Sequence, residues 1–134
     1  MATTGCAASV TPCSMNHEKI RRQPELRVLA LAERFCIDCY DSITRMPAAH
    51  RFRLCKQLED ACFQLVSLVI DAAASGQKSK VYRLDEHIRF IHSTIRVGVE
   101  CKVIKASTAG NRAKQLSEIG SIVGAWKQRI NSNR

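Results

Sequence analysis

Three basic side chains recur at helical spacing in the segment IRFIHSTIRVGVECK. Arg89, His92 and Arg96 are separated by three and four residues, so on an α-helix they share one face. Such a row can bind phosphate groups, or it can be the solvated side of a surface helix. Asp85 and Glu100 share the same face and can reduce its charge by ion pairing. The segment is therefore a candidate anion-binding surface.

Three further bases, Arg83, Lys102 and Lys105, belong to the same predicted helix and are candidates for the same partner. The whole chain carries 21 Lys and Arg against 12 Asp and Glu, a formal net charge of +9. An excess of this size favours a polyanionic partner, although many basic proteins have none.

Thiol chemistry is the second possibility, because Cys36-Ile-Asp-Cys39 matches a C-x-x-C pattern. A redox pair needs this motif at a helix N-terminus after a strand, whereas here it falls in the middle of a predicted helix. A zinc site needs two more ligands, which Cys55, Cys62, Cys101 or a histidine can supply. We interpret the cysteines as reduced, buried packing residues, with metal binding and redox chemistry as the alternatives.

Patterns typical of catalysis are missing from the sequence. It contains no Glu-x-x-His pair, Gly-rich phosphate loop, nucleophile elbow or H-E-x-x-H motif. Glu59 and Asp60 are adjacent, and neighbouring positions on a helix diverge by about 100°, so they cannot share one proton. We predict a protein that is not an enzyme and has no catalytic residue, metal site or cofactor.

The pattern of apolar residues predicts an all-α fold. Aromatic residues make up 5% of the chain, and β-branched residues never alternate with polar ones over a strand's length. We expect an antiparallel up-down-up-down four-helix bundle over residues 24–131, between a disordered tail (1–23) and a short C-terminal tail (132–134). The predicted helices are 25–45, 48–75, 80–105 and 107–130.

Local signals place the helix ends. Pro47 ends the first helix and Gly76 the second, and Ser107 or Thr108 caps the last. On the first helix, Leu29, Ala32, Cys36, Cys39 and Ile43 form the predicted buried row. On the last helix, Gly120 and Gly124 are expected to allow close approach of a neighbouring helix.

The 80–105 helix has two apolar rows on nearly opposite sides. One row suits the core of the bundle, and a single four-helix core cannot easily bury the other. We therefore predict that the second row contacts another subunit, with a scatter of exposed apolar residues as the alternative. The second row consists of Phe90, Val97, Cys101 and Ile104.

Membrane insertion and export are not expected. The most apolar run, ACFQLVSLVIDAAA, is interrupted by Gln64, Ser67 and Asp71 and is shorter than the ~20 residues that a membrane span needs. The N-terminus has neither the basic start nor the apolar stretch of a signal peptide. We predict a cytoplasmic protein.

Three stretches resemble a known family. MPAAHRFRLCKQLEDAC resembles the helix 1–helix 2 junction of the four-helix-bundle family that includes proteins encoded in ribosomal RNA intervening sequences. It is most similar to the branch found in diversity-generating retroelements, the accessory variability determinant (Avd) proteins. LSEIGSIVGAWKQRIN resembles the Avd C-terminal helix. IHSTIRVG resembles a helix 3 segment that usually carries two arginines. Arg96 matches the second, and His92 stands where the first would be.

The resemblance covers about residues 25–131 and implies a non-enzymatic partner of a reverse transcriptase. Avd proteins are homopentameric barrels that bind nucleic acid, associate with the reverse transcriptase and support mutagenic cDNA synthesis and retrohoming. With this resemblance, we expect Arg96 to contact template RNA or the polymerase, with Arg89 and His92 of the same row as candidates. Arg83, Lys102 and Lys105 are further candidates as nearby bases. A ribosomal-RNA-intervening-sequence-type RNA-binding bundle without a polymerase partner is the alternative, and an enzyme or metalloprotein that uses the cysteines is a third.

Overall fold

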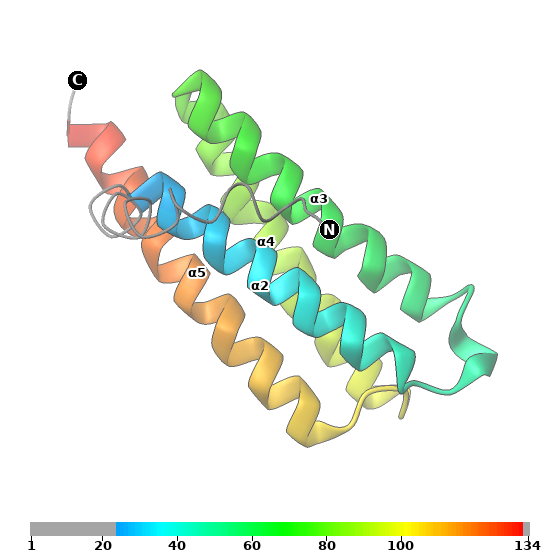
Figure 1. The fold of residues 1–134 in the computed structure, drawn as a ribbon. Coiled ribbons are helices and arrows are strands. Elements are labelled where there is room, and N and C mark those ends of the chain that lie inside the picture. The colour runs from blue at the N-terminus through cyan, green and yellow to red at the C-terminus, as the bar shows by residue number, and fades with distance from the viewer. Residues whose placement is uncertain (1–23, 133–134) are drawn as a thin grey trace, which may run out of the picture.

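A computed structural model describes residues 24–132 of the chain, and over this range the protein is entirely helical, as predicted. The predicted tail of residues 1–23 lies outside the described residues, as do the last two positions. The described elements, labelled in Figure 1, are α2 (Pro24–Thr44), the 3-10 turn η2 (Ala48–His50), α3 (Leu54–Ser75), α4 (Lys78–Glu100) and α5 (Ala106–Ser132).

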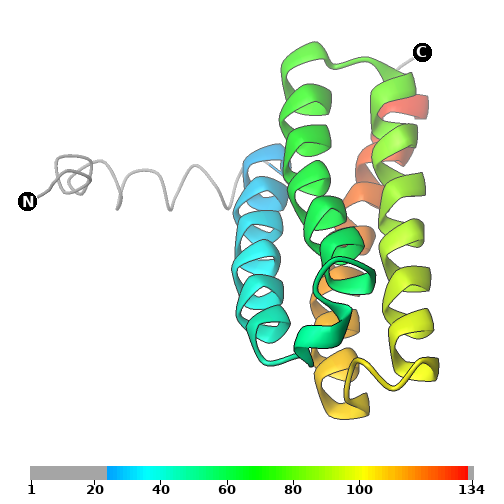
Figure 2. The same cartoon turned by 90° about the vertical axis from the view of Figure 1, so that its right-hand side faces the viewer.

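The four long helices pack around one core. Helix α2 lies against α3 and α5, and α4 lies against the same two helices from the other side. Figures 1 and 2 show that the α2–α3 linker (residues 45–53) and the α4–α5 linker (residues 101–105) lie at the same end of the bundle. We call this the linker end. Met46 and Pro47 of the first linker line one groove with Lys102 and Lys105 of the second, which confirms their proximity.

Each long helix contributes fully buried apolar side chains to the core. Burying one large aliphatic or aromatic side chain stabilises a fold by about 1.5–3 kcal/mol, so this shared core holds the helices together. Among the largest of these side chains are Phe35 of α2, Leu65 of α3, Leu84 and Ile91 of α4, and Leu116 and Ile119 of α5.

The buried row of α2 differs partly from the predicted one. Ala32, Cys36 and Cys39 are buried as expected, whereas Leu29 and Ile43 are only partly buried. Val28 and Phe35, which the predicted row omitted, are fully buried. Both sets fit helical spacing, and contact with α5 as well as α3 turns the buried face toward Val28 and Phe35.

Helix α3 begins six residues later than predicted. Residues 48–53 form tight turns, in which the backbone N–H groups of His50, Arg51 and Arg53 donate to carbonyls three residues earlier at 3.0–3.1 Å. A helix starting at Ala48 would extend beyond the neighbouring helices, and η2 has no buried residue. Short helical segments without such packing are marginal in water. The predicted end of α3 is confirmed, because Gly76 adopts φ 65°.

Helix α4 ends at Glu100 rather than at Lys105. The Lys102 N–H donates to the Val99 carbonyl at 3.0 Å, and the Val103 N–H donates to the Gly98 carbonyl at 2.9 Å. These two bonds form a Schellman motif, with Lys102 at φ 62° in the left-handed position that glycine usually occupies. The chain therefore turns back before the predicted helix is complete.

This turn moves Ile104 into the bundle's own core, where its side chain is 5% exposed. The prediction that Ile104 belongs to the outward apolar row of α4 is therefore wrong. Its side chain packs on Gly98, where an added Cβ would lie 2.8 Å from Ile104 Cγ1 and 3.0 Å from Leu54 Cδ2. Gly98 is thus the position at which close approach requires glycine.

Two predictions for α5 are wrong. An added Cβ at Gly120 would meet nothing closer than Ile88 Cγ2 at 3.8 Å, and one at Gly124 would meet nothing within 4 Å, so neither glycine serves a close approach within the described bundle. Ser107 and Thr108 lie inside the helix, which begins at Ala106, so they do not cap it.

None of the helices within residues 24–132 is both long enough and apolar enough to span a membrane. The apolar run singled out in the sequence belongs to α3, which directs Ala61, Leu65, Leu68 and Ala72 into the bundle core. Its apolar residues therefore serve packing between helices.

Candidate nucleic-acid interface

The predicted basic row lies on α4 along its side toward α5. Arg89 and Arg96 are exposed, and His92 is half-buried. His92 and Arg96 line a shallow groove of about 460 Å³, whose α5 wall contains the small residues Ala109 and Gly110. The helical spacing thus placed the three side chains correctly, but they differ in their surroundings.

Arg89 is engaged in an ion pair. Its Nη2 donates to Asp85 Oδ2 at 2.7 Å, and Lys127 Nζ of α5 donates to the same oxygen at 3.1 Å. The Asp85 side chain is only 15% exposed, so the cluster ties α4 to α5. Lys127 also lies over the Tyr82 ring, 4.6 Å from its centroid. Much of the Arg89 charge is therefore used within the bundle.

His92 adds little positive charge at neutral pH. Burial lowers the pKa of its imidazole, and the nearby Arg96 guanidinium lowers it further. Arg96 itself donates to Ser93 Oγ at 3.1 Å and forms no ion pair with any residue in 24–132. Arg96 is therefore the one member of the predicted row whose charge is available to a partner, as far as the described residues show.

The other three predicted bases do not join this row. Arg83 is exposed near the start of α4, thirteen residues before Arg96 and thus roughly 20 Å away along the helix. Lys102 and Lys105 are exposed in the α4–α5 linker. None of the three forms an ion pair with another described residue. The six candidates are therefore spread over the length of α4 and the linker end.

Two bases that the sequence analysis did not select, Arg51 and Arg53, are exposed in the α2–α3 linker at the same end as Lys102 and Lys105. Neither has an ion-pair partner among residues 24–132. Arg45 is also there, paired with Asp41 at 3.1 Å. The linker end therefore gathers bases from two segments fifty residues apart. The predicted up-down topology was the signal that could have connected them.

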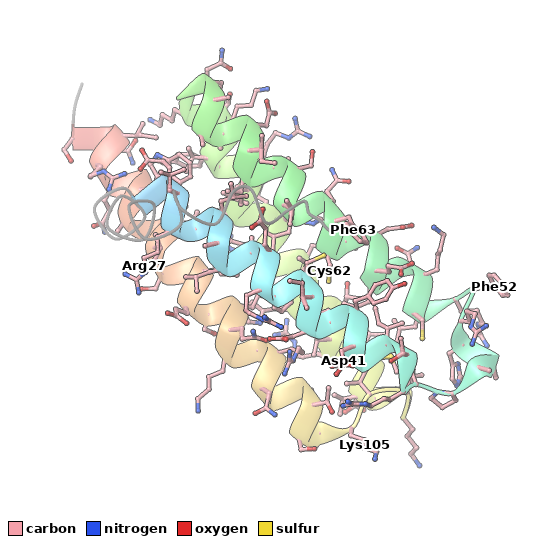
Figure 3. The ribbon with its side chains drawn as sticks, viewed as in Figure 1. Arg27, Asp41, Phe52, Cys62, Phe63 and Lys105 are labelled. Carbon is pink, nitrogen blue, oxygen red and sulfur yellow. The ribbon has the colours of Figure 1, made fainter. Side chains whose placement is uncertain are left out.

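Two shallow grooves meet at the linker end. The larger, about 640 Å³, is lined by Lys102, Lys105 and the first residues of α5. The other, about 390 Å³, is lined by Tyr40, Phe52 and Arg51. Met46 and Pro47 line both, so the two grooves adjoin at the α2–α3 linker. Figure 3 shows Phe52 and Lys105 at this end of the bundle, with Phe52 pointing away from it. The result is a basic surface with an aromatic border.

The outward apolar row of α4 keeps three of its four predicted members. Phe90 and Val97 are 51% and 52% exposed, and Cys101 is exposed just after the helix ends. A second set of exposed apolar side chains, which includes Phe63 and Ile70, lies on α3. Among the described helices, α3 and α4 thus both expose large apolar side chains.

The cysteines of the core are poorly suited to nucleophilic or redox chemistry. Cys36, Cys39, Cys55 and Cys62 are free and buried. A hydrogen bond with Cys39, together with burial, raises the pKa of the Cys62 thiol, and burial also raises that of Cys36. Protonated thiols are weak nucleophiles and weak metal ligands. Within residues 24–132, no group of three or more His, Cys, Asp or Glu side chains is arranged to hold a metal ion.

Comparison with known proteins gives one family. A family model described as bAvd-like matches residues 25–130 of the chain, which covers nearly the whole of all four helices. No curated protein matches the chain.

Proposed function

The chain belongs to the bAvd-like family, and from this premise we propose that it is a non-enzymatic accessory protein that joins the nucleic acid of a diversity-generating retroelement to its reverse transcriptase. Membership indicates an Avd protein and thus an accessory factor of such an element. The observation that carries the nucleic-acid part is the linker end, where bases that form no ion pair with the described residues come together from two linkers.

The linker end suits a phosphate backbone better than the α4 row does. Arg51, Arg53, Lys102 and Lys105 are exposed and form no ion pair with the described residues, so no internal contact has to break when they bind. Neutralising phosphates with such bases releases condensed counterions, which supplies most non-specific affinity for nucleic acid. We assign template-RNA binding to this end.

The groove between α4 and α5 suits a protein partner. Besides Arg96 and His92 it is lined mostly by apolar or small residues, among them Ile95, Val99 and Ala113. A mainly apolar groove with one available cation and a largely neutral imidazole resembles a protein-docking site more than a path for phosphates. We assign reverse-transcriptase contact to this groove, with Arg96 as its charged anchor.

Assembly into a homopentamer is the third part of the proposal. A closed ring of more than two subunits needs two different surfaces on each chain, because each subunit meets its neighbours head to tail. The Phe90–Val97–Cys101 surface of α4 and the Phe63–Ile70 surface of α3 supply such a pair. Five chains of +9 would carry a formal charge of +45 and strengthen binding to RNA.

Co-purification tests this function. The protein is expressed with the reverse transcriptase and the template RNA of a diversity-generating retroelement, and a tag on the protein is used for capture. We expect both partners to be retained. Arg96→Glu should release the polymerase but keep the RNA, whereas Lys78→Glu, at the far end of the bundle, should keep both.

Other outcomes distinguish the alternative. Retention of RNA without the polymerase, or the absence of a neighbouring reverse-transcriptase gene, would favour an RNA-binding protein of the ribosomal-RNA-intervening-sequence type. If neither partner is retained at low salt, the proposed function is wrong. Light scattering of the purified protein at micromolar concentration tests assembly, since a monomer would contradict the ring.

A further inference from the structure

The most exposed large apolar side chain among residues 24–132 is Phe52, which is 86% exposed at the linker end. Its neighbours in the chain are Arg51 and Arg53, both exposed. Figure 3 shows the ring projecting from the α2–α3 linker, away from the bundle. No packing among residues 24–132 covers this aromatic ring.

The backbone that carries Phe52 is well ordered by hydrogen bonds. The Arg51 N–H donates to the Ala48 carbonyl at 3.1 Å, and the Arg53 N–H donates to the His50 carbonyl at 3.1 Å. Arg53 is the N-cap residue of α3, and its carbonyl accepts the first helical hydrogen bond from the Gln57 N–H at 3.2 Å. Backbone hydrogen bonds are therefore present on both sides of the residue that carries the ring.

The charges around the ring indicate what it contacts. An aromatic anchor for a protein partner usually sits in an apolar surface with few charged neighbours. Phe52 is instead flanked in the chain by Arg51 and Arg53, neither of which forms an ion pair with another described residue. Proteins that bind single-stranded nucleic acid combine these two features: bases stack on an aromatic face while adjacent cations hold the phosphates.

The grooves at the linker end provide a path for such a strand. Phe52, Tyr40 and Arg51 line the first groove, and the second groove, which shares Pro47 with the first, is lined by Lys105. Glu59 is the one acid among the described residues that line the first groove, and Lys56 beside it is paired with Asp60 at 3.1 Å. The path thus begins with aromatic rings and ends with lysines.

We propose that the Arg51-Phe52-Arg53 turn is a stacking site for an unpaired base, and that the attached strand runs over Pro47 toward Lys102 and Lys105. The ligand class is single-stranded nucleic acid. This proposal rests on the proposed nucleic-acid function and adds a preference for unpaired segments of the template. Because a base pair inside a duplex cannot stack on the ring, duplex binds through phosphates alone.

Fluorescence anisotropy tests the preference. A labelled 20-nucleotide single strand of RNA, the same sequence as DNA, and an RNA duplex are titrated with the full-length protein. Phe52→Ala should lower affinity for the single strands on the order of tenfold, the size expected for losing one stacked base, and should leave the duplex nearly unchanged. Ile37→Ala, which removes a similarly exposed apolar side chain from α2 at a position outside every proposed interface, is the matched control.

A second variant reports contact directly. Phe52→Trp preserves stacking, and the natural Trp126 is buried in the core and supplies a constant background. We expect emission typical of a solvent-exposed indole that is quenched by the single strand but not by the duplex. Ile37→Trp, at the control position on α2, should respond to neither ligand. If Phe52→Ala lowers the affinity for single-stranded DNA and for single-stranded RNA equally, the ring stacks on a base and the ribose 2′-hydroxyl makes no contribution.

The outcomes separate this inference from the function on which it rests. If wild type binds RNA and Phe52→Ala binds equally well, the stacking site is wrong while the proposed function stands. A Phe52→Trp indole already shielded without RNA, and unresponsive to it, would also overturn the stacking site and place the ring in a protein interface. If wild type binds none of the three ligands, both proposals fail.

Discussion

The two basic regions of this protein, the α4 row and the linker end, differ in what their charges already do. On α4, Arg89 and Lys127 both donate to the same carboxylate oxygen of Asp85. The pKa of His92 is lowered, which favours its neutral form. At the linker end, Lys102 and Lys105 have no ion-pair partner among the described residues. A basic side chain is available to a ligand only when it is not already paired within the fold. The linker end is therefore the better candidate for binding nucleic acid.

The largest expected effect comes from reversing charge at the linker end. Lys102→Glu combined with Lys105→Glu should lower RNA affinity at least tenfold at low salt, because two phosphate contacts become repulsive. Fluorescence anisotropy measures the effect. Lys78→Glu combined with Arg83→Glu is the control with the same change in net charge. An equal loss in the control would show that overall charge, rather than this surface, determines binding.

Removing the Asp85 carboxylate from the α4 row should change RNA affinity less and in the opposite direction. Asp85→Asn releases Arg89 and Lys127, so RNA affinity should rise roughly twofold while stability falls by about 1 kcal/mol. Urea unfolding and anisotropy measure the two quantities on one sample. A tenfold gain in affinity would reveal a latent RNA site on α4 and remove the distinction between the regions.

Lys102 offers a test in which stability and binding move in opposite directions. Its left-handed backbone costs a non-glycine residue about 1–2 kcal/mol, so Lys102→Gly should stabilise the protein by about 1 kcal/mol. Loss of the ammonium group should at the same time weaken RNA binding several-fold. Lys105→Ala removes an equal charge without relieving any left-handed residue, and it should weaken binding without raising stability.

The smallest expected effect concerns the titration of His92. Since burial lowers the pKa of this imidazole in the folded state, the unfolded chain binds the proton more readily. Its contribution to stability is therefore fully present above the ordinary histidine pKa of about 6.5 and declines as the pH falls below it. His92→Gln should flatten this part of the stability–pH curve, as urea unfolding between pH 7.5 and 5 can show. An unchanged curve would contradict this account of His92.

The spacing of apolar residues predicted four helices and most of the core, because a helical period is a local property of the sequence. The ends at Leu54 and Glu100 were missed because they depend on tertiary contacts. Residues 48–53 place no side chain in the core, and Ile104 leaves the helical path to pack on Gly98.

The candidate site was harder to predict than the fold. Spacing located Arg89 and Arg96 on one face, but it could not show that Lys127, from another helix, shares the carboxylate that Arg89 binds. The linker end combines Arg51 with Lys102, which only the folded topology brings to the same end. Sequence periodicity therefore finds faces of single elements, whereas surfaces built from two linkers need the structure.

The central claim, that the linker end binds nucleic acid, is tested most directly by the salt dependence of RNA affinity. The slope of log affinity against log salt counts the phosphates neutralised, about 0.7 per contact for a single strand. Alanine at Arg51, Arg53, Lys102 and Lys105 together should make the slope shallower by about 3. Alanine at Arg89 and Arg96 should change it by less than 1. If the slope becomes shallower by more in the Arg89/Arg96 variant than in the linker-end variant, RNA binds along α4 and the linker end has another role.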